Sequence, residues 1–252
     1  MDYERSHVIA QREALRQWFK TPLGLSLLGD ERLVLDAVLD TLFGYYALQI
    51  GVAADADLLA KSRIRQRMVL DAALLGPGQV SAGPGALGEP DALPVMTDCI
   101  DLVLLHHTLE FEPDPHEVLR EVDRILIPEG HVIIVAFNPW SLWALKRRLR
   151  KRQARPPWCG HYLGLNRLKD WFRLLGFDIE LVRPVAFRPP LEQERLMQRL
   201  QFMERAGRRW WPMFAGVNIV VAKKRVATLT PIKPRWRSAP VVADAIETSG
   251  SR

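Results

Sequence analysis

The sequence predicts an α/β fold in which a mostly parallel sheet carries helices on both faces. Two observations lead to this prediction. Apolar runs of strand length, such as "IDLVLL" and "HVIIVAF", are continuous rather than alternating, as in strands covered on both faces. These runs alternate with segments of helical periodicity along most of the 252 residues, enough for one large domain.

The first elements are predicted from periodicity and end signals. Residues 4–19 have apolar positions at helical spacing, and a second helix begins at Pro22 with Thr21 as its N-cap. This helix is expected to run to about Phe43, where Gly44 stops it. The first strand is "YYALQIG", followed by a helix over 55–67 and a strand at 68–72. The Gly/Pro-rich stretch 76–90 is predicted to be a loop with one short strand.

The second half begins with a central strand in "CIDLVLLHH". In "DPHEVLREVDRIL", Asp114 is the expected N-cap, Pro115 the first helical residue, and Glu117 completes a capping box. A strand over 131–137, a helix over 165–175 closed by Gly176, a strand over 177–187, a polar helix near 191–207 and a last strand at 216–224 complete the series. The last two strands lack an equivalent helical crossover, so we expect an antiparallel strand at one edge.

Three regions are expected: a helical lead-in over 1–44, a main domain over 45–225, and a disordered basic tail over 226–252. The net charge of +6 permits an acidic partner and equally suits a soluble enzyme with basic edges. Cys99 and Cys159 have no paired spacing, so no metal site is expected. The sequence has neither a signal-peptide pattern nor an apolar run of membrane-spanning length, and we expect a cytoplasmic location.

The middle of the chain resembles class I S-adenosylmethionine-dependent methyltransferases of the type 11 kind. The matching motifs are "EPDALPV", "IDLVLLHHTLEF" and "REVDRILIPEG", and the later "RLKDWFRLLGFDIELV" looks like the family's late helix and strand. The resemblance covers about residues 45–185. It implies a Rossmann-like methyltransferase fold with a mostly parallel seven-stranded sheet and an antiparallel edge strand. It also implies S-adenosylmethionine as cofactor and methyl transfer to an unidentified acceptor.

The loop after the first strand departs from the family's pattern of an acid and several glycines. Gln49 stands in place of the acid, and Gly51 is the only glycine. A glycine there lets the backbone approach a ligand closely. Asp55 or Asp57 either holds the ammonium end of the cofactor or belongs to the first turn of a helix.

Further cofactor contacts follow from the resemblance alone. It implies that Asp71 binds the ribose hydroxyls. The alternative is that Asp71 is an acidic residue of a surface turn without a role in binding. The resemblance also implies that Glu89 contacts the adenine amino group, that Leu93 packs near the ring, and that His106 lines the boundary between cofactor and substrate. The sparse loop motivates a rival hypothesis, a non-catalytic methyltransferase-like module that binds a partner, RNA or an anionic surface. In that module, side chains around residues 52–55 and 83–89 would fill the carboxyl edge of the sheet where a cofactor would otherwise bind.

Substrate-side candidates lie at the ends of two strands: His107, Glu110, Asn138 and Trp140. The histidines and Glu110 are equally open to a structural role. No catalytic residue is assigned, because methyl transfer needs mainly proximity and alignment. The segment Lys146–Arg155 holds seven basic residues and no acid, and indicates either an anionic partner, RNA or a membrane surface, or a solvated helix face.

Overall fold

Seven strands form a single sheet in the computed structural model of the chain. The model describes residues 2–51, 56–71, 85–149, 156–191, 193, 196 and 199–226, with only the backbone described at 2–6 and 71. The strands are β1 Tyr46–Gly51, β2 Gln66–Asp71, β3 Gly85–Leu87, β4 Ile100–His106, β5 Leu126–Phe137, β6 Phe177–Val185 and β7 Val217–Lys224.

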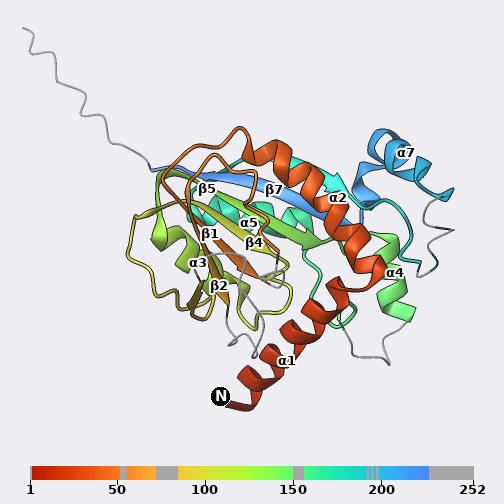
Figure 1. Cartoon of the computed structure of the whole chain (residues 1–252), viewed down its shortest axis with the longest axis horizontal. Helices are drawn as coiled ribbons and strands as arrows, with labels where there is room; N and C mark the ends of the chain where they lie inside the picture. The colour runs from red at the N-terminus through yellow and green to blue at the C-terminus, as the bar shows by residue number, and fades with distance from the viewer. Residues whose placement is uncertain are drawn as a thin grey trace, which may run out of the picture.

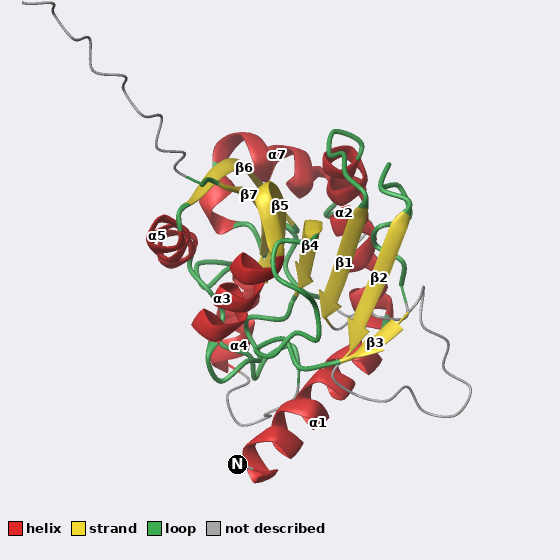
Figure 2. Cartoon of the chain, turned by 90° about the vertical axis from the view of Figure 1, so that its left-hand side faces the viewer, coloured by secondary structure: helices red, strands yellow, loops and turns green. Residues whose placement is uncertain are grey.

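The strand order is β3-β2-β1-β4-β5-β7-β6 (Figure 2). The pairs among β1 to β5 are parallel, whereas β7 is antiparallel to both β5 and β6. This confirms the predicted mostly parallel sheet. The antiparallel strand β7 lies one place in from the edge, which β6 forms. The order reverses between β1 and β4, where open α/β sheets bind ligands beyond the carboxyl ends of their strands.

Helices cover both faces of the sheet (Figure 1). They are α1 Asp2–Phe19, α2 Pro22–Leu39, α3 Pro115–Ile125, α4 Leu142–Leu149, α5 Leu165–Leu175 and α7 Phe202–Trp210, with a short 3-10 turn at Pro212–Phe214. Buried side chains of α1, α2 and α4 share one apolar cluster with Leu102 and Leu104 of β4. Those of α3 and α5 share a second cluster with Val103 and Leu105. Successive residues of one strand therefore enter opposite cores, which explains its continuous apolar run.

The predicted starts of α2 and α3 are confirmed. Thr21 Oγ1 accepts a hydrogen bond from Gly24 N at 3.2 Å, and Asp114 Oδ1 accepts one from His116 N at 2.9 Å. The carboxylate of Glu117 pairs with Arg120. Helix α2 ends at Leu39, before the predicted end near residue 43.

The helix predicted over 55–67 is wrong in its described part. Residues 56–65 form turns and bends, and β2 begins at Gln66. Side chains form hydrogen bonds with backbone N–H groups here. Asp57 Oδ1 accepts from Leu59 N, and Ser62 Oγ accepts from Ile64 N, both at 3.1 Å. Such local bonds replace the helical ones that propensity would favour.

Two other predictions meet the limits of the described residues. Of the polar helix near 191–207, α7 supplies the part from Phe202 onward, and several positions between 192 and 198 lie outside the described residues. The tail beyond residue 226 lies outside them as well. Within the described part of the chain, no helix is both long and apolar enough to cross a bilayer.

Candidate functional site

The carboxyl ends of β1 and β4 meet at Gly51 and His106, which are paired in the sheet. Gly51 has φ +134°, a conformation that residues with a side chain rarely adopt. A Cβ atom there would lie 2.1 Å from the carbonyl oxygen of His106 and 2.8 Å from Oγ1 of Thr108. Thr108 in turn donates to the carbonyl of Ile50 at 3.1 Å. Glycine is therefore required at the point where the chain leaves β1 toward residues 52–55.

Asp71 ends β2 at the same edge of the sheet, next to Leu87 of β3. Its side chain is not described, so the predicted ribose contact stays a prediction. Glu89 follows β3 and forms an isolated antiparallel bridge with Ala92. The side chain of Leu93 is buried in the cluster under α3, and its backbone N–H donates to Glu121 at 3.0 Å. Asp71 thus ends β2 and Glu89 follows β3, and their contacts with a cofactor stay predictions.

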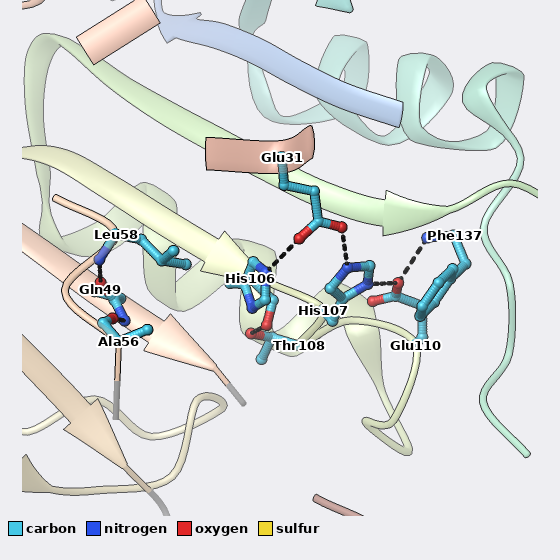
Figure 3. A network of polar contacts seen from close by, with 9 residues as sticks. All are labelled: Glu31, Gln49, Ala56, Leu58, His106, His107, Thr108, Glu110 and Phe137. Carbon is cyan, nitrogen blue, oxygen red and sulfur yellow. Dashed lines mark hydrogen bonds and ion pairs between the residues drawn. The ribbon is translucent and has the colours of Figure 1, made fainter. Parts of the chain in front are cut away.

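Gln49 stands where the family usually has an acid, and its carboxamide both donates and accepts a hydrogen bond. Nε2 donates to the carbonyl of Ala56 and Oε1 accepts from Leu58 N, each at 3.0 Å (Figure 3). A carboxylate has no N–H and could make only the second bond. The chain that follows residues 52–55 is thereby attached to the interior of β1.

The end of β4 carries a buried polar network that reaches α2 (Figure 3). One carboxylate oxygen of Glu31 lies 3.0 Å from Nε2 of His106, and the other lies 2.9 Å from Nε2 of His107. All three side chains are fully buried. Both predicted histidines are therefore turned toward the core formed with α1 and α2, and the ring of Phe19 lies 5.2 Å from that of His106.

The network continues from His107 to Glu110 and on to β5. His107 Nδ1 lies 3.0 Å from Oε1 of Glu110, and the same oxygen accepts from Phe137 N at 2.8 Å. His107 has φ +48°, so these contacts hold the chain in a left-handed turn as it leaves β4. Among the described residues, Oε2 of Glu110 and Nδ1 of His106 are buried without a hydrogen-bond partner.

The charges of this network follow from its contacts. Burial opposes ionisation of Glu31, but the charge of His107 and hydrogen bonds from both imidazoles outweigh it and lower its pKa to about 2. Burial also disfavours the imidazolium of His107, yet Glu31 and Glu110 raise its pKa to about 9. Burial keeps the pKa of His106 below its ordinary value. At neutral pH His107 is therefore cationic and His106 neutral, each donating through Nε2 to the Glu31 carboxylate.

Glu31 was not predicted as a site residue, although the sequence carries a signal for it. It lies four residues after Leu27 and four before Leu35, on the buried face of α2. An acid on such a face needs a buried partner. Glu31, His106 and His107 also offer donor atoms within 4.8 Å of one another, as a metal centre would need. Because each Glu31 oxygen already accepts from one imidazole, hydrogen bonding accounts for these contacts.

Asn138 and Trp140 follow β5 and differ in exposure. Asn138 is buried, and its Nδ2 donates to the carbonyls of Met213 at 2.8 Å and Ala215 at 2.9 Å. It thus joins the end of β5 to the segment before β7. Trp140 is exposed and lines a cavity of about 670 Å³ together with Met213 and Phe214. Asn138 also lines this cavity, but Trp140 is the more exposed of the two side chains.

The basic segment is described only as far as residue 149. Lys146 Nζ donates to the carbonyl of Pro190 at 2.5 Å, and Arg147 Nε donates to that of Trp158 at 3.1 Å. Arg148 is exposed. The first two cations of the run thus bind carbonyls of their own chain, and residues 150–155 lie outside the described part.

Comparisons with known proteins agree with this architecture. A methyltransferase domain family model matches residues 55–134. The uncharacterized protein YafS of Escherichia coli is 33% identical over 138 residues, which are 55% of this chain and 55% of that protein. The chain thus matches about half the length of this curated relative.

Solved structures share the fold at low identity. An S-adenosylmethionine-dependent methyltransferase from Mesorhizobium loti is 16% identical, with a TM-score of 0.55, over 76% of this chain and 96% of that one. The [4+2]-cyclase SpnF is also 16% identical, with a TM-score of 0.54, over 77% and 81% of the two chains. A fold shared with a cyclase leaves the reaction itself open. Residues 55–134 thus match a methyltransferase domain family, and the strand order belongs to a fold that the chain shares with S-adenosylmethionine-dependent methyltransferases.

Proposed function

We propose that this chain binds S-adenosylmethionine beyond the carboxyl ends of β1, β2 and β4 and transfers its methyl group to an acceptor. The observation that supports this most directly is the backbone of Gly51. Its positive φ and its close contact with the His106 carbonyl leave no room for a side chain at the switch point of the sheet. The chain itself fills the space that a side chain would take, so Gly51 supports the proposal through its place at the switch point, where open α/β sheets bind ligands.

Asp71 and Glu89 are the proposed polar contacts of the cofactor. Asp71 would accept from the ribose hydroxyls and Glu89 from the adenine amino group, because carboxylates are acceptors matched to those donors. Leu93 would contribute to the apolar floor near the ring. His106 has no exposed side-chain surface, so we assign it to positioning Gly51 through its carbonyl oxygen.

The bound cofactor supplies an electrophilic methyl group on a sulfonium. The protein's own contribution is to align the acceptor and exclude water, and it needs no general base if the acceptor is already nucleophilic. His107 and Glu110 are fully buried and bound to each other, so they position the end of β4. Trp140 is the exposed candidate on the substrate side. We also propose that the basic segment 146–155 contacts an anionic partner.

The test is isothermal titration of the full chain with S-adenosylmethionine and its demethylated product. We expect binding of both, and a loss of affinity of about tenfold in Asp71→Asn, because one charge-assisted hydrogen bond is removed. Asp170→Asn on the exposed face of α5 is the matched control and should bind like the wild type. Absence of binding by the folded wild type at millimolar cofactor would overturn the proposal in favour of a non-catalytic module.

A further inference from the structure

We propose that the protein docks on an anionic membrane through an apolar surface formed by α4 and the residue Trp140 before it, and by the end of α7 and the 3-10 turn after it. This docking surface consists of Trp140, Leu145, Leu149, Trp210, Met213 and Phe214. The inference identifies the anionic partner of the proposed function, but membrane docking itself does not depend on methyl transfer.

The docking surface brings several exposed large apolar side chains into one region. Leu149 is 79% exposed and Trp210 75%, while Trp140 and Met213 are each 69% exposed. Single exposed apolar residues are common on protein surfaces, but a group of large ones marks a place where something binds. These side chains would lose their contact with water if hydrocarbon covered them.

The two segments that form the docking surface lie on the same side of the molecule, at the right of Figure 1. Asn138 ties them together, since its Nδ2 donates to the carbonyls of Met213 and Ala215. Trp140, Met213 and Phe214 also line one cavity of about 670 Å³. The aromatic side chains near α4 and those after α7 therefore belong to one region.

Helix α4 turns an apolar face outward. Trp143 and Ala144 are buried, whereas Leu142, Leu145 and Leu149 are exposed at a spacing of three and four residues. Both Lys146 and Arg147 bind backbone carbonyls of the same chain, as described above. The outward face of α4 is therefore a leucine stripe beside the exposed Arg148.

The exposed charges on α7 are positive. Arg205, Arg208 and Arg209 are exposed, and Glu204 is the helix's one acid. Glu204 is only partly exposed and accepts from Nε of Arg188 at 3.0 Å, a cation that it shares with Asp30. Arginines that border exposed indole rings match the headgroup region of an anionic bilayer, with the rings at the level of the interface.

A membrane fits this combination better than the other occupants do. RNA would use the arginines and the tryptophans, but Leu145, Leu149 and Met213 offer nothing to a base or a phosphate. A second copy of the chain would bring arginines of like charge together. Residues 227–252 carry four basic and two acidic residues, so their net charge also repels Arg208 and Arg209. Only a surface that is both anionic and apolar satisfies both kinds of side chain.

The experiment is flotation of the full chain with vesicles of phosphatidylcholine alone or mixed with phosphatidylglycerol. We expect partitioning onto the anionic vesicles that weakens with added salt. Leu145→Gln with Leu149→Gln, and separately Arg208→Gln with Arg209→Gln, should each reduce this partitioning by about thirtyfold. All four positions are exposed, and circular dichroism checks that the variants are folded.

Matched controls carry the same changes elsewhere on the surface. Leu33→Gln with Leu174→Gln replaces leucines that are 73% and 82% exposed, and Arg120→Gln with Arg173→Gln removes two exposed arginines. Both controls should partition like the wild type. Absence of anionic vesicle binding would overturn the inference, as would equal losses in variants and controls. Retention of a single-stranded RNA, or a concentration-dependent dimer, without vesicle binding would assign the surface to those partners instead. Cofactor titration reports separately on the proposed methyltransferase activity.

Discussion

Glu31 of α2 and His107 at the end of β4 lie 76 positions apart in sequence and form a fully buried pair, with Oε1 and Nε2 separated by 2.9 Å. The second Glu31 oxygen binds His106. One carboxylate thus attaches α2 to the end of β4, next to the proposed cofactor site.

Replacing Glu31 by Gln should destabilise the protein strongly. His107 keeps Glu110 as a partner, but the Gln side chain has one acceptor oxygen in place of two, so one of the two buried imidazole N–H groups loses its acceptor, at a cost of about 1–3 kcal/mol. Urea unfolding measures the loss. Asp40→Asn, which breaks the exposed pair with Arg63, is the control and should cost at most about 1 kcal/mol. Similar losses in both variants would show that the buried contacts of Glu31 contribute no more to stability than an exposed ion pair does.

Stability should fall as the pH rises from about 6.5 to 9. The pKa of His107 is raised to about 9, so folded His107 keeps its proton over a range where the unfolded residue has lost it. The stabilisation is complete below the unfolded pKa of about 6.5 and is lost as the pH approaches the folded pKa, by roughly 3 kcal/mol at most. Denaturant unfolding across this range measures the slope.

His107→Gln isolates this effect from other groups that titrate at high pH. Its unfolding free energy should change less between pH 6.5 and 9 than that of the wild type. Identical pH profiles would show that His107 is neutral in the folded protein. At the acid end the pKa of Glu31 is about 2, so its contribution is present above its unfolded pKa and disappears as the pH falls toward 2.

Gly51→Ala should lower stability by at least about 2 kcal/mol and weaken cofactor binding, because the new Cβ meets the His106 carbonyl in a strained φ region. Gly29→Ala in α2 is the control, since no atom lies within 4 Å of its added Cβ. It should be neutral or slightly stabilising. Unfolding and cofactor titration of both variants would contradict the account if Gly51→Ala behaved like Gly29→Ala.

Gln49→Glu restores the acid that the family usually has, yet it should be harmful here. The new carboxylate cannot donate to the carbonyl of Ala56 and leaves that contact repulsive, at a cost of about 1–3 kcal/mol. Thermal unfolding gives the stability change, and cofactor titration shows whether the loop that follows has moved. Gln17→Glu on α1 is the exposed control: it also replaces a donor by a carboxylate, here beside Glu13, but in contact with water, and it should cost at most about 1 kcal/mol. An unchanged melting temperature in Gln49→Glu would rule out the proposed bridging role.

The sequence predicted the elements whose signals are local. Asp114 with Pro115 marks the start of α3, Gly176 marks the end of α5, and continuous apolar runs mark β4 and β5. The helix over 55–67 was predicted wrongly, because periodicity does not reveal that side chains such as Asp57 bind the backbone. Helical propensity is a weak preference that such contacts override.

The candidate site, like the fold, has features with local sequence signals and features that depend on tertiary contacts. By itself, the sequence determined the family resemblance, the position of Gly51 at the end of the first strand, and the acids Asp71 and Glu89 near the sheet edge. Only the tertiary structure decided that His106 and His107 face Glu31 in the core, since that pairing joins residues about 75 positions apart. Local sequence specifies turns and caps, whereas the partner of a buried charge depends on which surfaces the packed layers bring together.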